Sequence, residues 1–107
     1  MRGSKKQRLE KKGWRLGTVQ DFLGLSDEEA AYVELRLRLA DSLKNRRRKR
    51  NLTQTDFAKL IHSSQSRVAK MEGGDPSVSL DLLIRSLLAL GASSRELART
   101  ISAASLP

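Results

Sequence analysis

The sequence predicts an all-α protein, a five-helix bundle preceded by a short helical N-terminal extension. Two observations predict this class. A serine or threonine followed three residues later by aspartate or glutamate recurs where helices would begin, and apolar residues recur at helical spacing between those points. No segment makes a convincing strand. The 107 residues suffice for one small domain with an appended arm, and a domain of this size buries about 65% of its unfolded surface.

The N-terminal half contains two predicted helices. A capping box at residues 18–21 predicts a short helix that Gly24 closes, and a second box at residues 26–29 opens a long helix that runs toward Arg48. Residues 33–39 alternate apolar and charged side chains, which taken alone predicts a strand. The capping box and the alanine, leucine, glutamate and arginine content favour a helix here instead.

Four shorter helices follow, each opened by a hydroxyl side chain that can cap the first turn. Glycine follows two of them, at 73–74 and at 91, where a left-handed residue ends a helix easily. Inward-facing apolar residues on the helix before Gly91 are predicted to be Leu80, Leu83, Ile84, Leu87 and Leu88. The predicted N-caps are Thr53, Ser64, Ser79 and Ser93, and the first two helices are expected to end near Ile61 and Glu72.

The composition excludes several classes of site. There is no cysteine, so a disulfide scaffold, a thiolate metal site and a cysteine nucleophile are all excluded. The single histidine, His62, cannot form a multi-histidine site, and the acidic residues fall on capping boxes and helix faces rather than in a metal cluster. We therefore expect no enzyme activity, no metal and no cofactor. No apolar run approaches the roughly 18 residues of a membrane span, which predicts a cytoplasmic protein without membrane contact.

The charge distribution points to a polyanionic partner. The formal net charge is +9, and the excess lies in two blocks: residues 1–17 carry seven bases and one acid, and residues 44–50 read KNRRRKR. Each block can also be explained as a solvated tail or as a basic helix end that complements the helix dipole. Aromatic residues make up only 4%, which weighs against single-strand binding by base stacking. Double-stranded nucleic acid is therefore the first candidate partner.

The segment Gln54–Gly73 carries the functional prediction. It reads QTDFAKLIHSSQSRVAKMEG, two short helices separated by about three residues, which leaves room only for a tight corner. The apolar residues at four positions of the segment can meet in one small core, and Ala58 lies where the two helices cross. The second helix then presents Gln65, Ser66, Arg67 and Lys70 outward, as in a helix-turn-helix whose second helix enters the major groove. The four core residues are Phe57, Ile61, Val68 and Met71.

Residues 38–91 resemble the phage repressor and Cro family of helix-turn-helix regulators. The pattern that carries the resemblance is LTQ, then FA, then SQxxVxxxE, in the segment LTQTDFAKLIHSSQSRVAKMEGG. The family's fold is the five-helix, lambda-repressor-like bundle, here about residues 27–104. Its members bind operator DNA, usually as dimers.

The resemblance implies roles for individual residues. Bases would be contacted by Gln65, Ser66, Arg67 and Lys70; glutamine can pair with adenine and arginine with guanine. DNA phosphates would be contacted from the starts of the two motif helices and from the basic end of the long helix. Arg47 would form a structural pair with Glu72. The implied phosphate contacts are Gln54, Ser64, Arg46, Arg48 and Lys49.

Three positions depart from the family pattern. His62 occupies the turn and Asn51 the bend before LTQ, where the family often has glycine; both residue types tolerate a left-handed backbone better than most. The loop after the second motif helix is often basic in the family, but here it reads GDPS at 74–77. That loop is therefore expected to add little to DNA binding.

The N-terminal segment suggests a second partner. The pattern GW…FLGLSxEE in residues 9–29 resembles the upstream segment of antitoxins of the host-inhibition-of-growth type, which pair DNA binding with capture of a small basic toxin. The acidic stretch Asp21–Glu34 would meet that toxin, and Trp14 is equally explained as a tail residue or as a partner anchor.

The predicted organisation is a basic, partly flexible extension at 1–25 and a DNA-binding domain at 26–107. Its last helices would form a homodimer through Leu87, Leu90, Leu97 and Ile101. The reason is that these side chains present more apolar surface than one small bundle can bury. The predicted function is a sequence-specific regulator, a repressor acting on an inverted-repeat operator, that also serves as an autoregulating antitoxin. The alternative is an interaction module whose helix-turn-helix serves mainly dimerisation or toxin capture.

Overall fold

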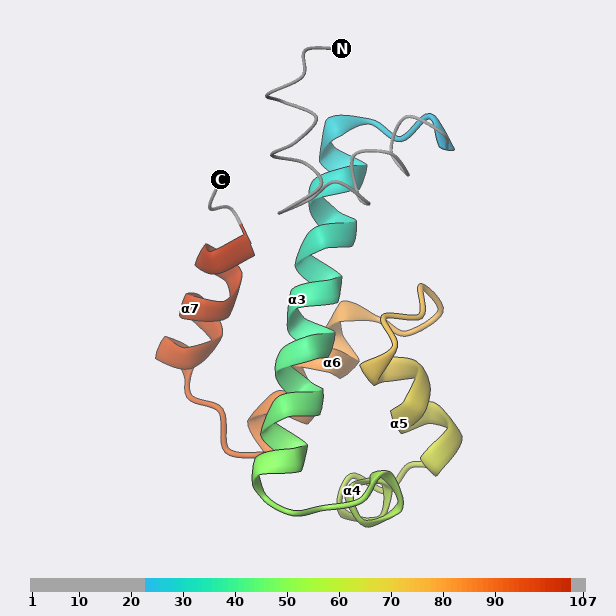
Figure 1. Cartoon of the computed structure of the whole chain (residues 1–107), viewed down its shortest axis with the longest axis vertical. Coiled ribbons are helices and arrows are strands. Elements are labelled where there is room, and N and C mark those ends of the chain that lie inside the picture. The colour runs from blue at the N-terminus through green and yellow to red at the C-terminus, as the bar shows by residue number, and fades with distance from the viewer. Residues whose placement is uncertain (1–22, 105–107) are drawn as a thin grey trace, which may run out of the picture. The chain divides into compact units, whose positions relative to one another are not determined.

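The computed structural model describes residues 23–104, with side chains as far as residue 102. The described residues contain five α-helices and no strand, so the all-α prediction is confirmed (Figure 1). The helices are α3 (Asp27–Lys49), α4 (Gln54–Leu60), α5 (Gln65–Glu72), α6 (Leu80–Ala89) and α7 (Ser94–Ala104).

The chain divides into two compact units within α3, between Glu34 and Leu35. The described part of the first unit comprises residues 23–34. The short helix predicted from residue 18 lies outside the described residues except for its end, where Gly24 has the expected left-handed backbone, with φ of +69°. The predicted domain boundary after residue 25 stays a prediction.

Local hydrogen bonds set the helix starts as the sequence predicts. In the first unit, Glu29 N donates to Ser26 Oγ at 3.1 Å and Ser26 N donates to a Glu29 carboxylate oxygen at 2.8 Å. The same reciprocal bonds open α4 at Thr53 and Asp56 and precede α7 at Ser93. These boxes satisfy amide groups that a helix start leaves without partners, and the continuous α3 shows that the alternating segment 33–39 is helical.

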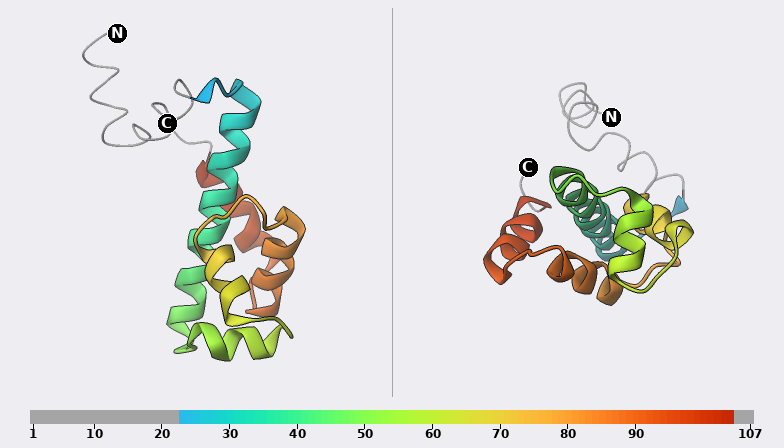
Figure 2. Two further views of the ribbon diagram at one scale, coloured as in Figure 1. Left: turned by 90° about the vertical axis from the view of Figure 1, so that its right-hand side faces the viewer. Right: turned by 90° about the horizontal axis from the view of Figure 1, so that it is seen from below.

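In the second unit, Leu35–Leu106, the helices pack around the C-terminal part of α3. Helices α4 and α5 lie to one side of α3 and α7 lies to the other, with α6 between them (Figure 2). The core contains Phe57, Val68 and Met71 of the motif, all fully buried, and Ala58 at 3% exposure. The predicted motif core is thus confirmed, with Ile61 only partly buried at its edge.

Helix α6 departs from the predicted pattern of burial. Leu83 and Leu87 are buried as expected, but Leu88 is 49% exposed, so its inward assignment was wrong. Ser86 is buried in its place and contacts Met71 Sδ at 3.6 Å. Leu87 and Leu90 are at most 2% exposed and therefore cannot supply the dimer contact assigned to them, because the bundle already buries them.

Both left-handed turn residues are where the sequence predicts them. Asn51 has φ of +57° and His62 has φ of +56°. Asn51 follows the end of α3, and His62 follows α4, where Ser63 N returns to donate to Ala58 O at 2.8 Å. Asparagine and histidine replace glycine here at a modest conformational cost, and the tight corner between α4 and α5 is preserved.

Candidate nucleic-acid interface

The surface that the motif presents begins at the N-terminus of α5. Ser64 caps this helix, its Oγ accepting from Arg67 N at 3.1 Å. Gln65, Ser66, Arg67 and Lys70 are all exposed, whereas Val68 and Met71 on the opposite face are buried. The sequence therefore builds a short helix with one apolar face held in the core and a polar face in solvent.

Four side chains form a continuous line of hydrogen bonds from α3 to this polar face. Arg47 donates from Nε and Nη2 to the two carboxylate oxygens of Glu72, at 2.5 and 3.0 Å. Gln54 Nε2 donates to Glu72 Oε1 at 3.1 Å, and Gln54 Oε1 accepts from Gln65 Nε2 at 2.6 Å. We call this set, Arg47, Glu72, Gln54 and Gln65, the relay.

The relay runs from the protein interior to the surface. The Glu72 side chain is only 3% exposed and Arg47 only 11%, Gln54 is half-buried and Gln65 is exposed. Arg47 also donates from Nη1 to Leu52 O at 2.6 Å, which holds the bend before α4. The structure thus brings the expected structural pair together and joins it to one expected base contact and one expected phosphate contact.

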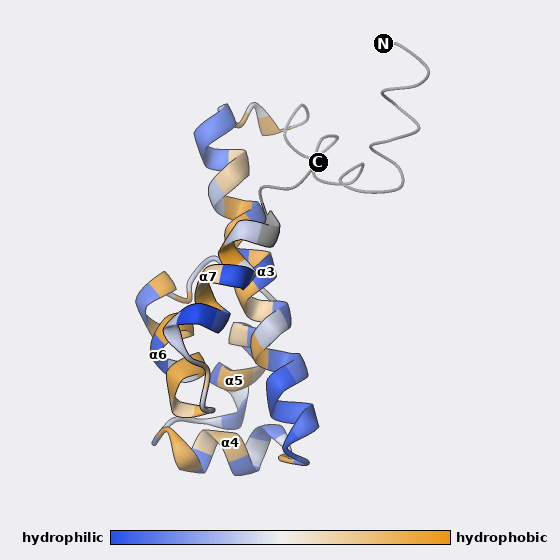
Figure 3. Cartoon of the chain, turned by 90° about the vertical axis from the view of Figure 1, so that its left-hand side faces the viewer, coloured by the Kyte–Doolittle hydropathy of each residue, from blue (hydrophilic) through white to orange (hydrophobic). Residues whose placement is uncertain are grey.

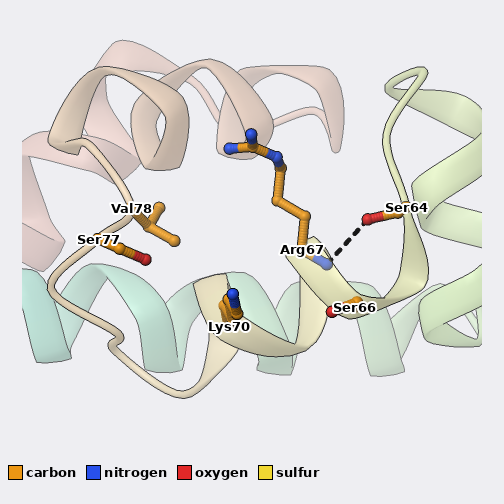
Figure 4. A pocket seen from close by; sticks show the side chains of 6 residues that line it. All are labelled: Ser64, Ser66, Arg67, Lys70, Ser77 and Val78. Carbon is orange, nitrogen blue, oxygen red and sulfur yellow. Dashed lines mark hydrogen bonds between the residues drawn. The ribbon is translucent and has the colours of Figure 1, made fainter.

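Arg67 and Lys70 belong to a second part of the surface. Together with Ser64, Ser66, Ser77 and Val78 they line a pocket between α5 and the loop that leads to α6 (Figure 4). Arg67 lies on the side of α5 that faces this loop, whereas Gln65 is bonded to α4. The four base-contacting candidates therefore form two groups, one beside α4 and one beside the α5–α6 loop.

The α5–α6 loop is fixed from behind by α3. Arg36, 7% exposed, donates from Nη1 to Val78 O. Gly74 has φ of +73°, a left-handed backbone conformation that favours glycine. A Cβ there would lie 2.6 Å from Leu37 Cδ2, so the Leu37 side chain would have to shift. Hydrogen bonds from Ser77, through its side chain and its backbone, hold the pKa of Asp75 below its ordinary value. The loop therefore keeps a carboxylate charge beside Lys70.

The basic residues 46–50, at and just after the end of α3, point in four directions. Arg47 enters the relay, while Arg46 Nη2 pairs with Glu96 of α7 at 3.2 Å and Arg50 Nη1 donates to Leu90 O at 3.2 Å. Arg48 and Lys49 are exposed, and the hydrophilic end of α3 is visible in Figure 3. Of the three expected phosphate contacts on α3, Arg46 is thus turned toward α7 and the other two face solvent.

Sequence reasoning missed the bonds that Gln54 makes within the protein and the role of Arg36. Arg36 precedes Ala40 and Leu43 at helical spacing, and that position on the buried stripe was the available signal. The two glutamines stand at the first positions of neighbouring helices, a placement that brings their side chains together once the corner is formed.

No group of three or more potential metal-ligating side chains occurs among residues 23–104. Within the same range, no helix combines the length and apolar character that crossing a membrane requires.

Comparison with known proteins identifies the same segment. A family model described as a helix-turn-helix domain matches residues 38–100, more than half of the chain and the whole interval from the middle of α3 into α7. No curated protein and no solved structure gives a significant match.

Proposed function

Because this chain belongs to the helix-turn-helix domain family, we propose that it is a sequence-specific regulator that binds double-stranded DNA and represses transcription. One observation carries the proposal: the polar face of α5 is exposed next to the capped start of α4, on a chain with a formal net charge of +9. A helix presented in this way fits the major groove. The proposed function is not enzymatic.

In the proposed complex, two groups of side chains contact the bases. Gln65, beside α4, pairs with adenine, and Arg67, beside the α5–α6 loop, pairs with guanine. Ser66 and Lys70 line the same pocket as Arg67, on the loop side of α5. Phosphates are contacted by Gln54 and Ser64 at the two helix starts and by the exposed cations Arg48 and Lys49. Arg46 contributes mainly to the positive electrostatic field of the protein rather than to a direct contact, because it is paired with Glu96.

We also propose that the chain binds as a symmetric dimer to an inverted repeat. Two recognition helices on one face of DNA lie about 34 Å apart. Leu88 of α6 is 49% exposed and replaces Leu87 and Leu90 in the proposed apolar contact, and Ile101 of α7, which the sequence already assigns to that contact, is 42% exposed. Occupation of the repeat would block a promoter.

Fluorescence anisotropy with double-stranded DNA tests the proposal. The full chain is titrated onto DNA from upstream of its own gene, with unrelated DNA as competitor, at several salt concentrations. A sequence-specific binder keeps its preference over competitor and loses affinity steeply as salt rises, because bound cations release counterions. Binding without sequence preference would favour the alternative, an interaction module.

Two arginines separate base contacts from phosphate contacts. Arg67→Ala is expected to cost about 1–3 kcal/mol of binding free energy and to relax preference at one base pair. Arg48→Ala should weaken binding to all DNA alike and lower the salt dependence. The measurement is anisotropy with a panel of single-base operator variants. If Arg67→Ala left every preference unchanged, its assignment to a base would be wrong.

A small basic toxin remains a proposed second partner. The first turn of α3 exposes Asp27, Glu28 and Glu29, and Leu23 and Tyr32 nearby are 60% and 45% exposed. An acidic surface with apolar side chains suits a basic protein. Co-expression with the neighbouring gene product tests this: a co-purifying complex and rescue of growth support the antitoxin function, and the absence of both rejects it.

A further inference from the structure

The hydrogen bonds of the relay can run in only one direction from donor to acceptor, and the buried pair of Arg47 and Glu72 sets that direction. A carboxylate only accepts hydrogen bonds and a guanidinium only donates them. Glu72 accepts two bonds from Arg47, one on each carboxylate oxygen, and Oε1 also accepts a third bond. Whatever lies next to that oxygen must therefore turn a donor toward it.

Gln54 transmits this direction to the surface. An amide side chain has a donating end and an accepting end, and by itself it can face either way. Gln54 must place Nε2 toward Glu72, which leaves Oε1 toward Gln65. That oxygen only accepts, so Gln65 must turn Nε2 toward it. The orientation of the exposed Gln65 amide is thus determined by a carboxylate that is 3% exposed.

We propose that Glu72 is a positioning residue that decides which base Gln65 selects; this inference rests on the proposed DNA-binding function. In the observed orientation, Gln65 keeps Oε1 and the second Nε2 hydrogen for DNA. One acceptor and one donor match N6 and N7 of adenine. With the amide reversed, both N–H groups would face DNA and match the two acceptors of guanine, O6 and N7. The buried carboxylate therefore favours adenine over guanine.

Two substitutions break the relay at different points. Glu72→Gln replaces an acceptor-only group with an amide that has a donor at one end, so the direction of the hydrogen bonds is no longer imposed on Gln54. Gln54→Leu leaves the pair of Arg47 and Glu72 intact but removes the link to Gln65. The matched control is Glu96→Gln, which neutralises a glutamate paired with the adjacent arginine, Arg46, on the other side of α3.

The experiment is selection of bound sequences from a randomised double-stranded DNA library, using the full chain and each variant. Selection with Gln65→Ala first identifies the base pair that Gln65 contacts, since preference there is lost. For the unaltered chain, that position should be adenine. Glu72→Gln and Gln54→Leu should lower the preference for adenine over guanine at that position by about tenfold, and should leave the position that depends on Arg67 unchanged. Glu96→Gln should leave both positions unchanged.

The outcomes of this selection distinguish failure of the inference about Glu72 from failure of the proposed DNA-binding function. If the unaltered chain selects no sequence, the proposed function fails and the inference with it. If the chain selects a sequence but both relay variants keep the adenine preference and merely bind all DNA more weakly, Glu72 is only structural and the inference is overturned. Circular dichroism checks folding; should Glu72→Gln be unfolded, Gln54→Leu alone decides, because it retains the buried ion pair.

Discussion

Two arginines that are adjacent in sequence, Arg46 and Arg47, pair with glutamates on opposite sides of α3, and the two pairs differ in kind. Toward α4 and α5, Arg47 makes two bonds to Glu72, and the two side chains are 11% and 3% exposed. Toward α7, Arg46 makes a single contact of 3.2 Å to Glu96, and the exposed fractions are 26% and 43%. The same residue types therefore form a buried ion pair with two hydrogen bonds on one side and a solvated ion pair with a single contact on the other.

The difference indicates which side of α3 is held more strictly in one arrangement. A buried pair must be completely satisfied, since either partner left alone keeps an uncompensated charge away from water. The relay meets this demand on the side that carries the candidate DNA surface. A solvated pair gains little because water competes for both charges. We infer that the α4–α5 side of α3 is held in one arrangement more strictly than the α7 side.

The largest expected effect separates the two glutamates directly. Glu72→Ala should lower the free energy of unfolding by about 3–5 kcal/mol, because Arg47 is left buried without its partner. Glu96→Ala should have a much smaller effect, since Arg46 can turn to solvent. Urea denaturation of each variant, followed by circular dichroism, measures the difference.

A double replacement tests the reason for that loss. Arg47→Met combined with Glu72→Leu removes both charges, so it should be less destabilising than Glu72→Ala alone. Equal losses in Glu72→Ala and Glu96→Ala would contradict the distinction between a buried and a solvated pair.

The sequence predicted the local structure well because its signals are local. The hydroxyl residues at 26, 53, 64, 79 and 93 each cap a helix start, and each cap depends on residues only three positions apart. The burial of α6 was harder to predict. Leu88, predicted to face inward, is exposed, and Ser86 is buried. The face that α6 buries depends on how neighbouring helices approach it, which spacing along one helix does not determine.

The candidate site was predicted as a set of residues but not as a network. The motif identifies Gln54, Gln65 and Glu72, yet the bonds between them join positions up to 18 residues apart. Such bonds exist only after the corner at His62 has formed. The split of the basic run has the same cause: the letters at 46–50 are nearly uniform, and only the positions of α5, α6 and α7 decide which cation is paired.

Removing the helix cap before α5 or the one before α7 is expected to change the free energy of unfolding less than Glu72→Ala does. Ser64→Ala and Ser93→Ala should each lower the free energy of unfolding by about 1 kcal/mol, because each removes one capping bond. Their effects on DNA should differ. Ser64→Ala loosens the first turn of α5, where the base-contacting candidates lie, and should weaken operator binding; Ser93→Ala should leave it unchanged. Urea denaturation and anisotropy measure the two quantities. Equal loss of DNA affinity would show that α7 also contributes to binding.

The smallest expected effect is on the pH dependence of stability, in which the α4 side and the α7 side of α3 should behave alike. The backbone bond from Thr53 lowers the pKa of Asp56 below its ordinary 3.8, and the backbone bond from Ser93, with Arg46, lowers the pKa of Glu96 below 4.5. Each carboxylate binds protons less readily folded than unfolded, so its contribution to stability is complete above its ordinary pKa and is lost as the pH falls through the lower folded value.

Thermal unfolding between about pH 3 and pH 7 measures this acid dependence. The midpoint should fall in acid, and the fall should be shallower in Asp56→Asn and in Glu96→Gln, because each variant removes one of the titrating groups. A similar reduction in the two variants would show that Asp56 and Glu96 contribute equally to the acid dependence. The contact between Arg46 and Glu96 would then add little to the capping bond of Glu96. An unchanged slope in either variant would mean that its capping bond adds nothing to stability.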